Sequence, residues 1–100
     1  MEFRHDTSRH RYVLEDAAAT MVASTNYTVR QERIFFNHTE IADSYEGQGL
    51  GTKLVQAALD DVRATGTKIV PLCAYVRGWI ERHPEYDDLV DHDLLSLYLR

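Results

Sequence analysis

The chain has 100 residues, a hydrophobic content of 44% and a formal net charge of −5. This length provides one modest core, so we expect a single folded domain over residues 1–100 rather than a disordered chain. The acidic balance and the absence of a Lys/Arg run argue against a nucleic-acid partner and suit a partner that carries an amine.

Cysteine and histidine usage limits the chemistry further. Cys73 is the single cysteine, which excludes an internal disulfide and a cysteine-cluster zinc site. His5, His10 and His92 lie apart without a helical i, i+4 pair, so we expect no metal. Because the N-terminus lacks the apolar region of a signal peptide and no apolar run approaches membrane-spanning length, we expect a cytoplasmic protein without a membrane partner.

The first forty residues have the composition of β-strands. We predict strands at residues 11–15 and 18–26, separated by an acidic turn, with Phe3 either beginning or extending the first strand. Residues 27–32 are polar and are predicted to form a hairpin loop. Residues 33–41 contain two adjacent phenylalanines and are the most strand-like run in the chain.

The middle of the chain predicts a helix between two strands. Apolar residues recur at three- and four-residue spacing over residues 50–63, which indicates an amphipathic helix, and Gly66 is placed to cap its C-terminus. Residues 68–73 resemble a buried parallel strand, in which Pro71 indicates an edge or a separation of strands. Strand, turn, helix and strand form a right-handed βαβ crossover, so 68–73 should lie parallel to 33–41.

The last quarter of the chain predicts short helices. One covers residues 75–82 and is stopped at His83–Pro84, and the other covers residues 91–100 with Asp91 as its N-cap. We expect Trp79, Ile80, Pro84 and Tyr86 to be core or covering residues. Arg77, Arg82 and His83 are expected on a solvated face, with contact to phosphates of a ligand as the alternative. Leucines at 94, 95, 97 and 99 either dock on the domain or form a dimer seam, so the protein is expected to be a monomer or a weak dimer.

A glycine-rich stretch, Tyr45 to Gly51, runs directly into the predicted helix. Alternate glycines allow a tight turn and close approach to a ligand, and the helix behind them offers unpaired N–H groups to an anion. Such a loop suits a phosphate or pyrophosphate. The spacing does not match the dinucleotide fingerprint G-x-G-x-x-G or the nucleotide P-loop.

The stretch resembles the acyl-CoA loop of the Gcn5-related N-acetyltransferases, in which Gln or Arg is followed by two residues, Gly, one residue and Gly or Ala. Glu46 departs from this pattern, and Gly47, Gln48, Gly49, Leu50 and Gly51 follow it. His38–Ile41, Val70–Val76 and Arg82–Tyr86 occur in the expected order around it. Together these motifs resemble a family of very small acetyltransferase-like proteins over roughly residues 11–90.

The resemblance implies a compact α/β (α+β) fold, with N-terminal antiparallel strands, a βαβ crossover and short C-terminal helices. It also implies that acetyl-CoA lies between two separating parallel strands and places its pyrophosphate on the loop amides. The residues expected to bind it are the end of the first parallel strand and the loop: Ile41, Ala42, Asp43, Gly47, Gln48, Gly49, Leu50, Gly51, Thr52 and Lys53.

Four residues are candidates for catalysis. His38 and Glu40 are two apart on a predicted strand and share one face unless a bulge intervenes. Either can deprotonate an amine, and Glu40 resembles the base that this superfamily often carries on the strand before the loop. Cys73 could accept the acetyl group as a thiolate or orient CoA, or be a small buried residue. Tyr75 could protonate the leaving thiolate or simply pack.

The sequence therefore predicts an N-acetyltransferase that moves an acetyl group from acetyl-CoA to an amine on a small molecule or a polypeptide. Two alternatives remain open. The first is a CoA-binding module without transferase activity, which the departure at Glu46 favours. The second is an interaction protein that uses its acidic surface and leucine-rich tail.

Overall fold

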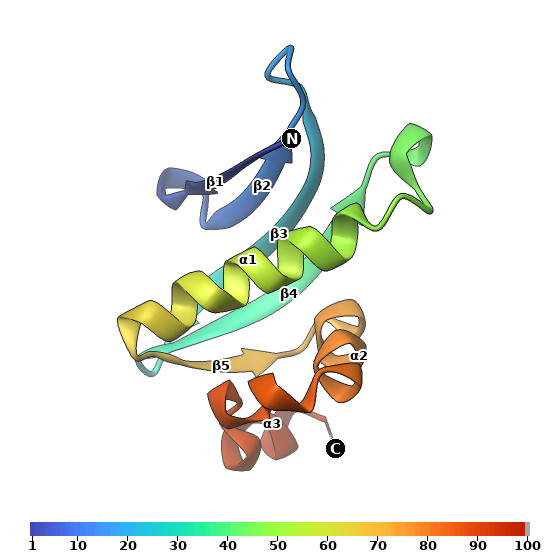
Figure 1. Cartoon of the computed structure of the whole chain (residues 1–100). Helices are drawn as coiled ribbons and strands as arrows, with labels where there is room; N and C mark the ends of the chain where they lie inside the picture. Colours follow the sequence, from blue (N-terminus) through green and yellow to red (C-terminus); the bar gives the residue numbers. More distant parts are fainter. Residues whose placement is uncertain (100) are drawn as a thin grey trace.

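A single five-stranded sheet organises the chain in a computed structural model that describes residues 1–99 (Figure 1). The strands lie in chain order, β1-β2-β3-β4-β5. β1 to β4 pair antiparallel and β4 pairs with β5 in parallel, as the crossover predicts. Their bounds are Glu2–Asp6, Arg11–Glu15, Met21–Arg30, Arg33–Ile41 and Lys68–Pro71.

The β3–β4 hairpin corrects the predicted loop at residues 27–32. β3 begins at Met21, not at 18, and continues to Arg30, so the connection has only two residues, Gln31 and Glu32. Both have positive φ, 53° and 59°, as tight primed hairpin turns require. The second half of β3 was not predicted as a strand because its sequence is polar and only Tyr27 in it is buried.

The N-terminus forms a strand of its own. Phe3 lies in β1 opposite Leu14 rather than extending β2, and a short 3-10 turn, Thr7–Arg9, joins the two strands. Asp6 closes this turn from β1, accepting hydrogen bonds from the side chains of Ser8, Arg9 and Arg11.

Helix α1 (Leu50–Thr65) covers one face of the sheet. Its apolar side meets the aromatic rings of β2, β3 and β4, and the Tyr12 hydroxyl donates to Asp61 at 2.7 Å. The helix begins as predicted and runs two residues past Arg63, where Gly66 caps it with φ 75°. The amphipathic spacing and the C-cap are therefore confirmed.

Two further helices and a 3-10 segment complete the chain. α2 (Ala74–Arg82) lies beside α1 and ends at His83 before Pro84, as predicted. After the 3-10 segment η3 (Pro84–Leu89), α3 (His92–Tyr98) starts at the predicted cap, where the Asp91 side chain accepts from Leu94 N. Arg100, the predicted end of this helix, lies outside the described residues.

The C-terminal helix packs on the face of the sheet opposite α1. The Tyr98 ring meets Phe35 edge-on at 5.3 Å, and Arg33 Nε donates to Asp91 at 2.9 Å. Leu95 is buried, so the tail does dock on its own chain, although Leu97 and Leu99 remain about half exposed. None of the helices in residues 1–99 has the length and apolarity that crossing a membrane requires.

The predicted core of the last quarter is confirmed with one exception. Trp79, Ile80 and Tyr86 are buried, and the Tyr86 hydroxyl donates to Asp60 of α1 at 2.7 Å. Pro84 is exposed because it begins η3 at the surface, so of its two predicted roles, core or covering residue, the core role is wrong.

Candidate functional site

The glycine loop lies between the end of β4 and the start of α1. After Ile41 the chain makes one 3-10 turn, η2 (Asp43–Tyr45), and then passes through Gly47 and Gly49. Both glycines have positive φ, 80° and 74°, which explains why residues without Cβ occur here. Gly49 is itself the N-cap of α1, and no side chain caps this helix end.

The start of α1 therefore offers free backbone donors. The first backbone bond of the helix runs from Lys53 N to the Gly49 carbonyl, at 3.3 Å, which leaves the N–H groups of residues 50–52 without helical acceptors. Thr52 and Lys53 are exposed beside them, and Lys53 makes no ion pair within residues 1–99. Free N–H groups at a helix N-terminus are a general binding site for anions such as phosphate.

Gln48 and Glu46 border the loop. The Gln48 side chain folds back and donates to the Ser44 carbonyl at 3.4 Å, so it stabilises the loop from within. Glu46 is exposed, and its backbone N–H is taken by the Asp43 carbonyl. Its carboxylate adds a negative charge close to the anion-binding end of α1.

Gly51 has a different role from the other two glycines. It lies inside α1 and is buried, and a Cβ there would collide with the Tyr75 hydroxyl and lie 2.7 Å from Ile41 Cδ1. The Tyr75 side chain therefore reaches from α2 across to the first turn of α1. Of the loop glycines predicted to face a ligand, this one makes room for a side chain of the protein.

The two parallel strands separate just below the loop. Their pairing ends at Phe36 and Pro71, so β5 is shorter than the predicted 68–73, and Cys73 is the N-cap of α2 rather than a strand residue. Cys73 N still donates to the Phe36 carbonyl at 2.8 Å. In the described part of the chain, no strand pairs with this edge of β4 beyond that point, which leaves a backbone edge for an extended ligand.

Cys73 belongs to a small buried chain of polar groups. Its thiol donates to Thr39 Oγ1 at 3.4 Å, and Thr39 Oγ1 lies 2.9 Å from Thr25 Oγ1. Thr25 is fully buried and Cys73 is 8% exposed. Sequence reasoning missed both threonines, because strand alternation places Thr39 opposite Thr25 only once the β3–β4 register is known.

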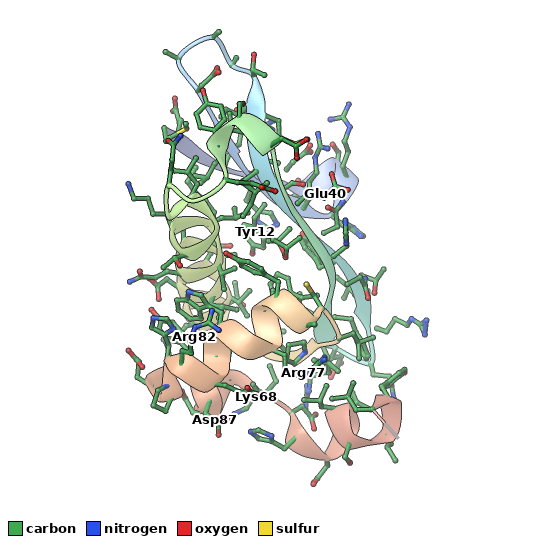
Figure 2. The ribbon with its side chains drawn as sticks, turned by 90° about the vertical axis from the view of Figure 1, so that its right-hand side faces the viewer. Tyr12, Glu40, Lys68, Arg77, Arg82 and Asp87 are labelled. Atoms are coloured by element: carbon green, nitrogen blue, oxygen red, sulfur yellow. The ribbon has the colours of Figure 1, made fainter. Side chains whose placement is uncertain are left out.

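His38 and Glu40 do share a face, as predicted. His38 Nε2 and Glu40 Oε1 are 2.9 Å apart, and both side chains are largely exposed. The register shifts just before this pair, so no residue of β3 lies directly opposite Asn37, although the Asn37 side chain donates to Thr28 Oγ1 at 3.3 Å. Successive side chains of a strand point to opposite faces of the sheet, and Thr39, which contacts Cys73, lies between His38 and Glu40 in the sequence. The His38–Glu40 pair therefore lies on the face away from Cys73. Figure 2 shows Glu40 on the side of the sheet away from Tyr12 and α1.

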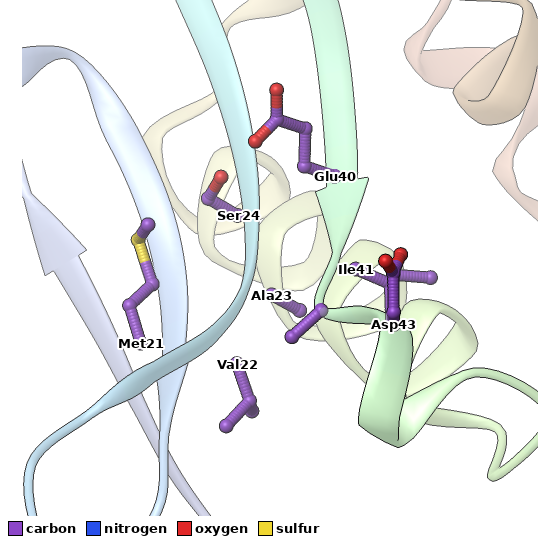
Figure 3. Close-up of a pocket in the computed structure, with 8 residues that line it drawn as sticks. Met21, Val22, Ala23, Ser24, Glu40, Ile41 and Asp43 are labelled. Carbon is purple, nitrogen blue, oxygen red and sulfur yellow. The ribbon is translucent and has the colours of Figure 1, made fainter.

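An open hollow of about 480 Å³ lies beside Glu40, where β3 begins and β4 ends (Figure 3). Eight residues line it: four from the start of β3 (Met21, Val22, Ala23 and Ser24), two from the end of β4 (Glu40 and Ile41) and the next two of the chain (Ala42 and Asp43). Three of them, Ile41 to Asp43, are residues that were predicted to border the ligand. The hollow and the glycine loop thus flank the same short segment.

The basic residues of α2 are only partly available to an anion. Arg77 is half-buried, and its Nη1 donates to the carbonyls of Pro71 and Leu72, so it was wrongly placed on a solvated face. His83 Nδ1 contacts the Trp79 carbonyl at 2.8 Å, and its ring stacks on the Trp79 ring, whereas Arg82 is exposed. Within residues 1–99, no three His, Cys, Asp or Glu side chains are grouped to hold a metal ion.

Comparison with known proteins identifies the architecture. A family model described as GCN5-related N-acetyl-transferase matches residues 11–89. The chain belongs to the GCN5-related N-acetyltransferase family. Its structure matches the solution structure of a GCN5-like protein from Staphylococcus aureus with a TM-score of 0.69 and 26% identity, over 89% of this chain and 86% of the other.

Two vertebrate proteins are also similar to this chain in sequence. Protein NATD1 from Gallus gallus is 28% identical over 85 residues, which cover 84% of this chain and 77% of the relative. Protein NATD1 from Homo sapiens is 30% identical over 81 residues, covering 80% and 72%. The predicted family and the α/β fold are therefore confirmed.

Proposed function

We propose that the protein transfers an acetyl group from acetyl-CoA to an amine, with the glycine loop holding the pyrophosphate. The single observation that carries this proposal is the uncapped N-terminus of α1 behind two positive-φ glycines, within a chain of this family. Helix-end binding contributes about 0.3–2 kcal/mol per charge, so the loop needs help from the rest of the ligand.

In this proposal the exposed edge of β4 provides the additional contacts to the ligand. The pantetheine arm would pair with backbone groups near Ile41 to Asp43, where β5 no longer does so. Lys53 and Thr52 would meet the phosphates from the first turn of α1. Tyr75 lies against the same turn, so its hydroxyl is the nearest candidate to protonate the CoA sulfur as it leaves.

Glu40 is the proposed base. The acceptor enters as an ammonium ion, and its proton passes to the Glu40 carboxylate directly or through one water. The free amine then attacks the thioester carbonyl and the carbon–sulfur bond breaks. The sulfur takes a proton from the Tyr75 hydroxyl, and the nitrogen gives up its remaining extra proton, which restores that hydroxyl through solvent. His38 holds the carboxylate from 2.9 Å and fixes its orientation.

A direct transfer is favoured over an acetyl-cysteine. Cys73 is nearly buried, and its thiol is committed to Thr39 on the face opposite Glu40. In the direct route Cys73 is a packing and hydrogen-bonding residue. A Cys73→Ala variant is expected to retain turnover, whereas loss of turnover together with an acetyl adduct on the unmodified protein would establish the covalent route.

The decisive experiment mixes the protein with acetyl-CoA and a panel of primary amines and follows the release of free thiol. We expect release that depends on the amine, with the acetyl group found on the amine by mass spectrometry. Saturable acetyl-CoA binding without release for any amine would leave the alternative of a CoA-binding module. Absence of both would reject the loop assignment.

A further inference from the structure

We propose that the hollow beside Glu40 is the acceptor site and that it selects primary amines carrying a second positive charge. This inference rests on the proposed acetyl transfer and names its substrate class. It starts from the eight residues that line the hollow of about 480 Å³, which come from the start of β3, the end of β4 and the two residues that follow β4.

Ser24 is the first indication that a ligand belongs there. Its side chain lines the hollow although the residue is only 4% exposed, and its hydroxyl has no hydrogen-bond partner within residues 1–99. The β3–β4 register sets Ser24 directly opposite Glu40, and Figure 3 shows both side chains at the hollow. Because this hydroxyl remains accessible from the hollow, it can accept a hydrogen bond from an N–H donor of a ligand.

The charge of the lining is the second indication. Glu40 and Asp43 both line the hollow, and no Lys or Arg does. Glu40 is held by His38, whereas Asp43 makes no ion pair within residues 1–99. Two carboxylates without a basic residue between them produce a negative potential that attracts cations and repels anions.

The arrangement suggests a division of roles. The reacting nitrogen would lie between the Ser24 hydroxyl and the Glu40 carboxylate, and the second cation would lie at Asp43, two residues beyond the end of β4. Met21 and Val22 provide apolar surface for the methylene groups between the two charges. A single-charge amine would use only the first half of this site.

The test compares three amines with the same four-carbon chain: 1,4-diaminobutane, 1-aminobutane and 4-aminobutanoate. We expect kcat/KM to be about three- to fivefold higher for the diamine than for 1-aminobutane, because an ion pair that is exposed to solvent contributes only modestly to binding. For 4-aminobutanoate we expect a kcat/KM below that of 1-aminobutane, because its carboxylate is repelled by Asp43. Equal values for all three would overturn the inference while leaving the proposed transfer intact. Turnover of none of them would overturn the inference, and the proposed transfer would then be judged separately by the full amine panel.

A matched pair of variants locates the selectivity. Asp43→Asn should reduce the ratio between diamine and monoamine to about one, whereas Asp93→Asn on α3 makes the same change in net charge and should keep the ratio. Ser24→Ala should raise KM for all three amines more than KM for acetyl-CoA. A ratio that is unchanged in Asp43→Asn, or reduced equally in Asp93→Asn, would contradict the proposed site.

The source of the cationic amine is decided by a second set of substrates. Peptides with one acceptor lysine, flanked by either a second lysine or a glutamate, present the same chemistry on a polypeptide. Higher kcat/KM for the dilysine peptide than for the diamine would assign the site to polypeptides. The reverse order would assign it to small diamines, and in both cases the flanking glutamate should lower the rate.

Discussion

At the scale of single residues, the separation of Glu40 from Cys73 by the sheet gives the clearest test of mechanism. Glu40→Gln keeps the shape of the side chain but cannot take a proton, so kcat should fall by about 10²–10⁴-fold. KM for acetyl-CoA should change little, because the proposed pyrophosphate contacts lie on α1. Steady-state kinetics with a saturating diamine measures both. Glu81→Gln on α2 is the matched control, and an equal loss in that variant would contradict the assignment.

Asp6 is a residue-scale test of stability. Burial raises its pKa, but hydrogen bonds from Ser8, Arg9 and Arg11 outweigh burial and lower the pKa to about 2, from an ordinary value of 3.8. Since the folded pKa lies below the unfolded one, this stabilisation is fully present above pH 3.8 and is lost as the pH falls through about 2.

The Asp6→Asn variant should therefore be less stable at neutral pH and should show a flatter decline of the free energy of unfolding between pH 3.8 and about 2. Urea unfolding at a series of pH values measures this slope. Asp93→Asn, which removes an exposed carboxylate, is the control. Identical slopes in Asp6→Asn and the unchanged protein would refute the role given to the β1–β2 turn.

At the scale of elements, local patterns predicted much of the fold. The 50–63 spacing, the Gly66 cap and the Asp91 cap are all encoded within a few residues, and the structure confirms them. The end of β3 was missed because its outer half is polar and its tight turn lacks the usual glycine. Neither propensity nor alternation signals such a strand.

The candidate site also has one part that the local sequence predicted and another that it did not. The glycine loop is contiguous in sequence, so its motif could be recognised directly. The pairing of Ser24 with Glu40 and the chain from Cys73 to Thr25 depend on strand register, and the contact of Tyr75 with Gly51 depends on how α2 packs beside α1. These relations join residues far apart in the sequence, and no local pattern contains them.

The contact between α1 and α2 predicts an unusual effect of adding a methyl group. In an open helix position, Gly→Ala stabilises by roughly 0.5–1 kcal/mol. At Gly51 the new Cβ would collide with the Tyr75 hydroxyl and press on Ile41, and overpacking of this kind costs about 1–3 kcal/mol. We therefore expect Gly51→Ala to destabilise the protein.

A double-mutant cycle separates the two effects. In a Tyr75→Ala background the main obstacle is gone, so Gly51→Ala should be much less destabilising, with a coupling of about 1 kcal/mol. Denaturant unfolding of the four proteins gives the coupling free energy. Additive effects would mean that Tyr75 does not occupy the space beside Gly51.

At the scale of the whole molecule, ligand binding and folding are linked because the loop exists only in the folded chain. A ligand at about 100 times its Kd stabilises the folded state by about 2.7 kcal/mol. For a domain of this size each kcal/mol shifts Tm by about 4–8 °C, so acetyl-CoA should raise Tm by on the order of 10–20 °C. A thermal melt followed by circular dichroism measures the shift.

The two ends of α1 provide a matched pair of variants for this test. Gly49 and Gly66 both cap the helix in the left-handed conformation, with φ 74° and 75°, and a Cβ at either position meets no atom within 4 Å. Gly49→Val and Gly66→Val should therefore lower Tm by similar amounts through backbone strain. Only Gly49→Val should lose the shift produced by acetyl-CoA, because only that glycine lies at the end of the helix where the N–H groups are free. Equal shifts in the two variants would place the ligand away from the N-terminus of α1.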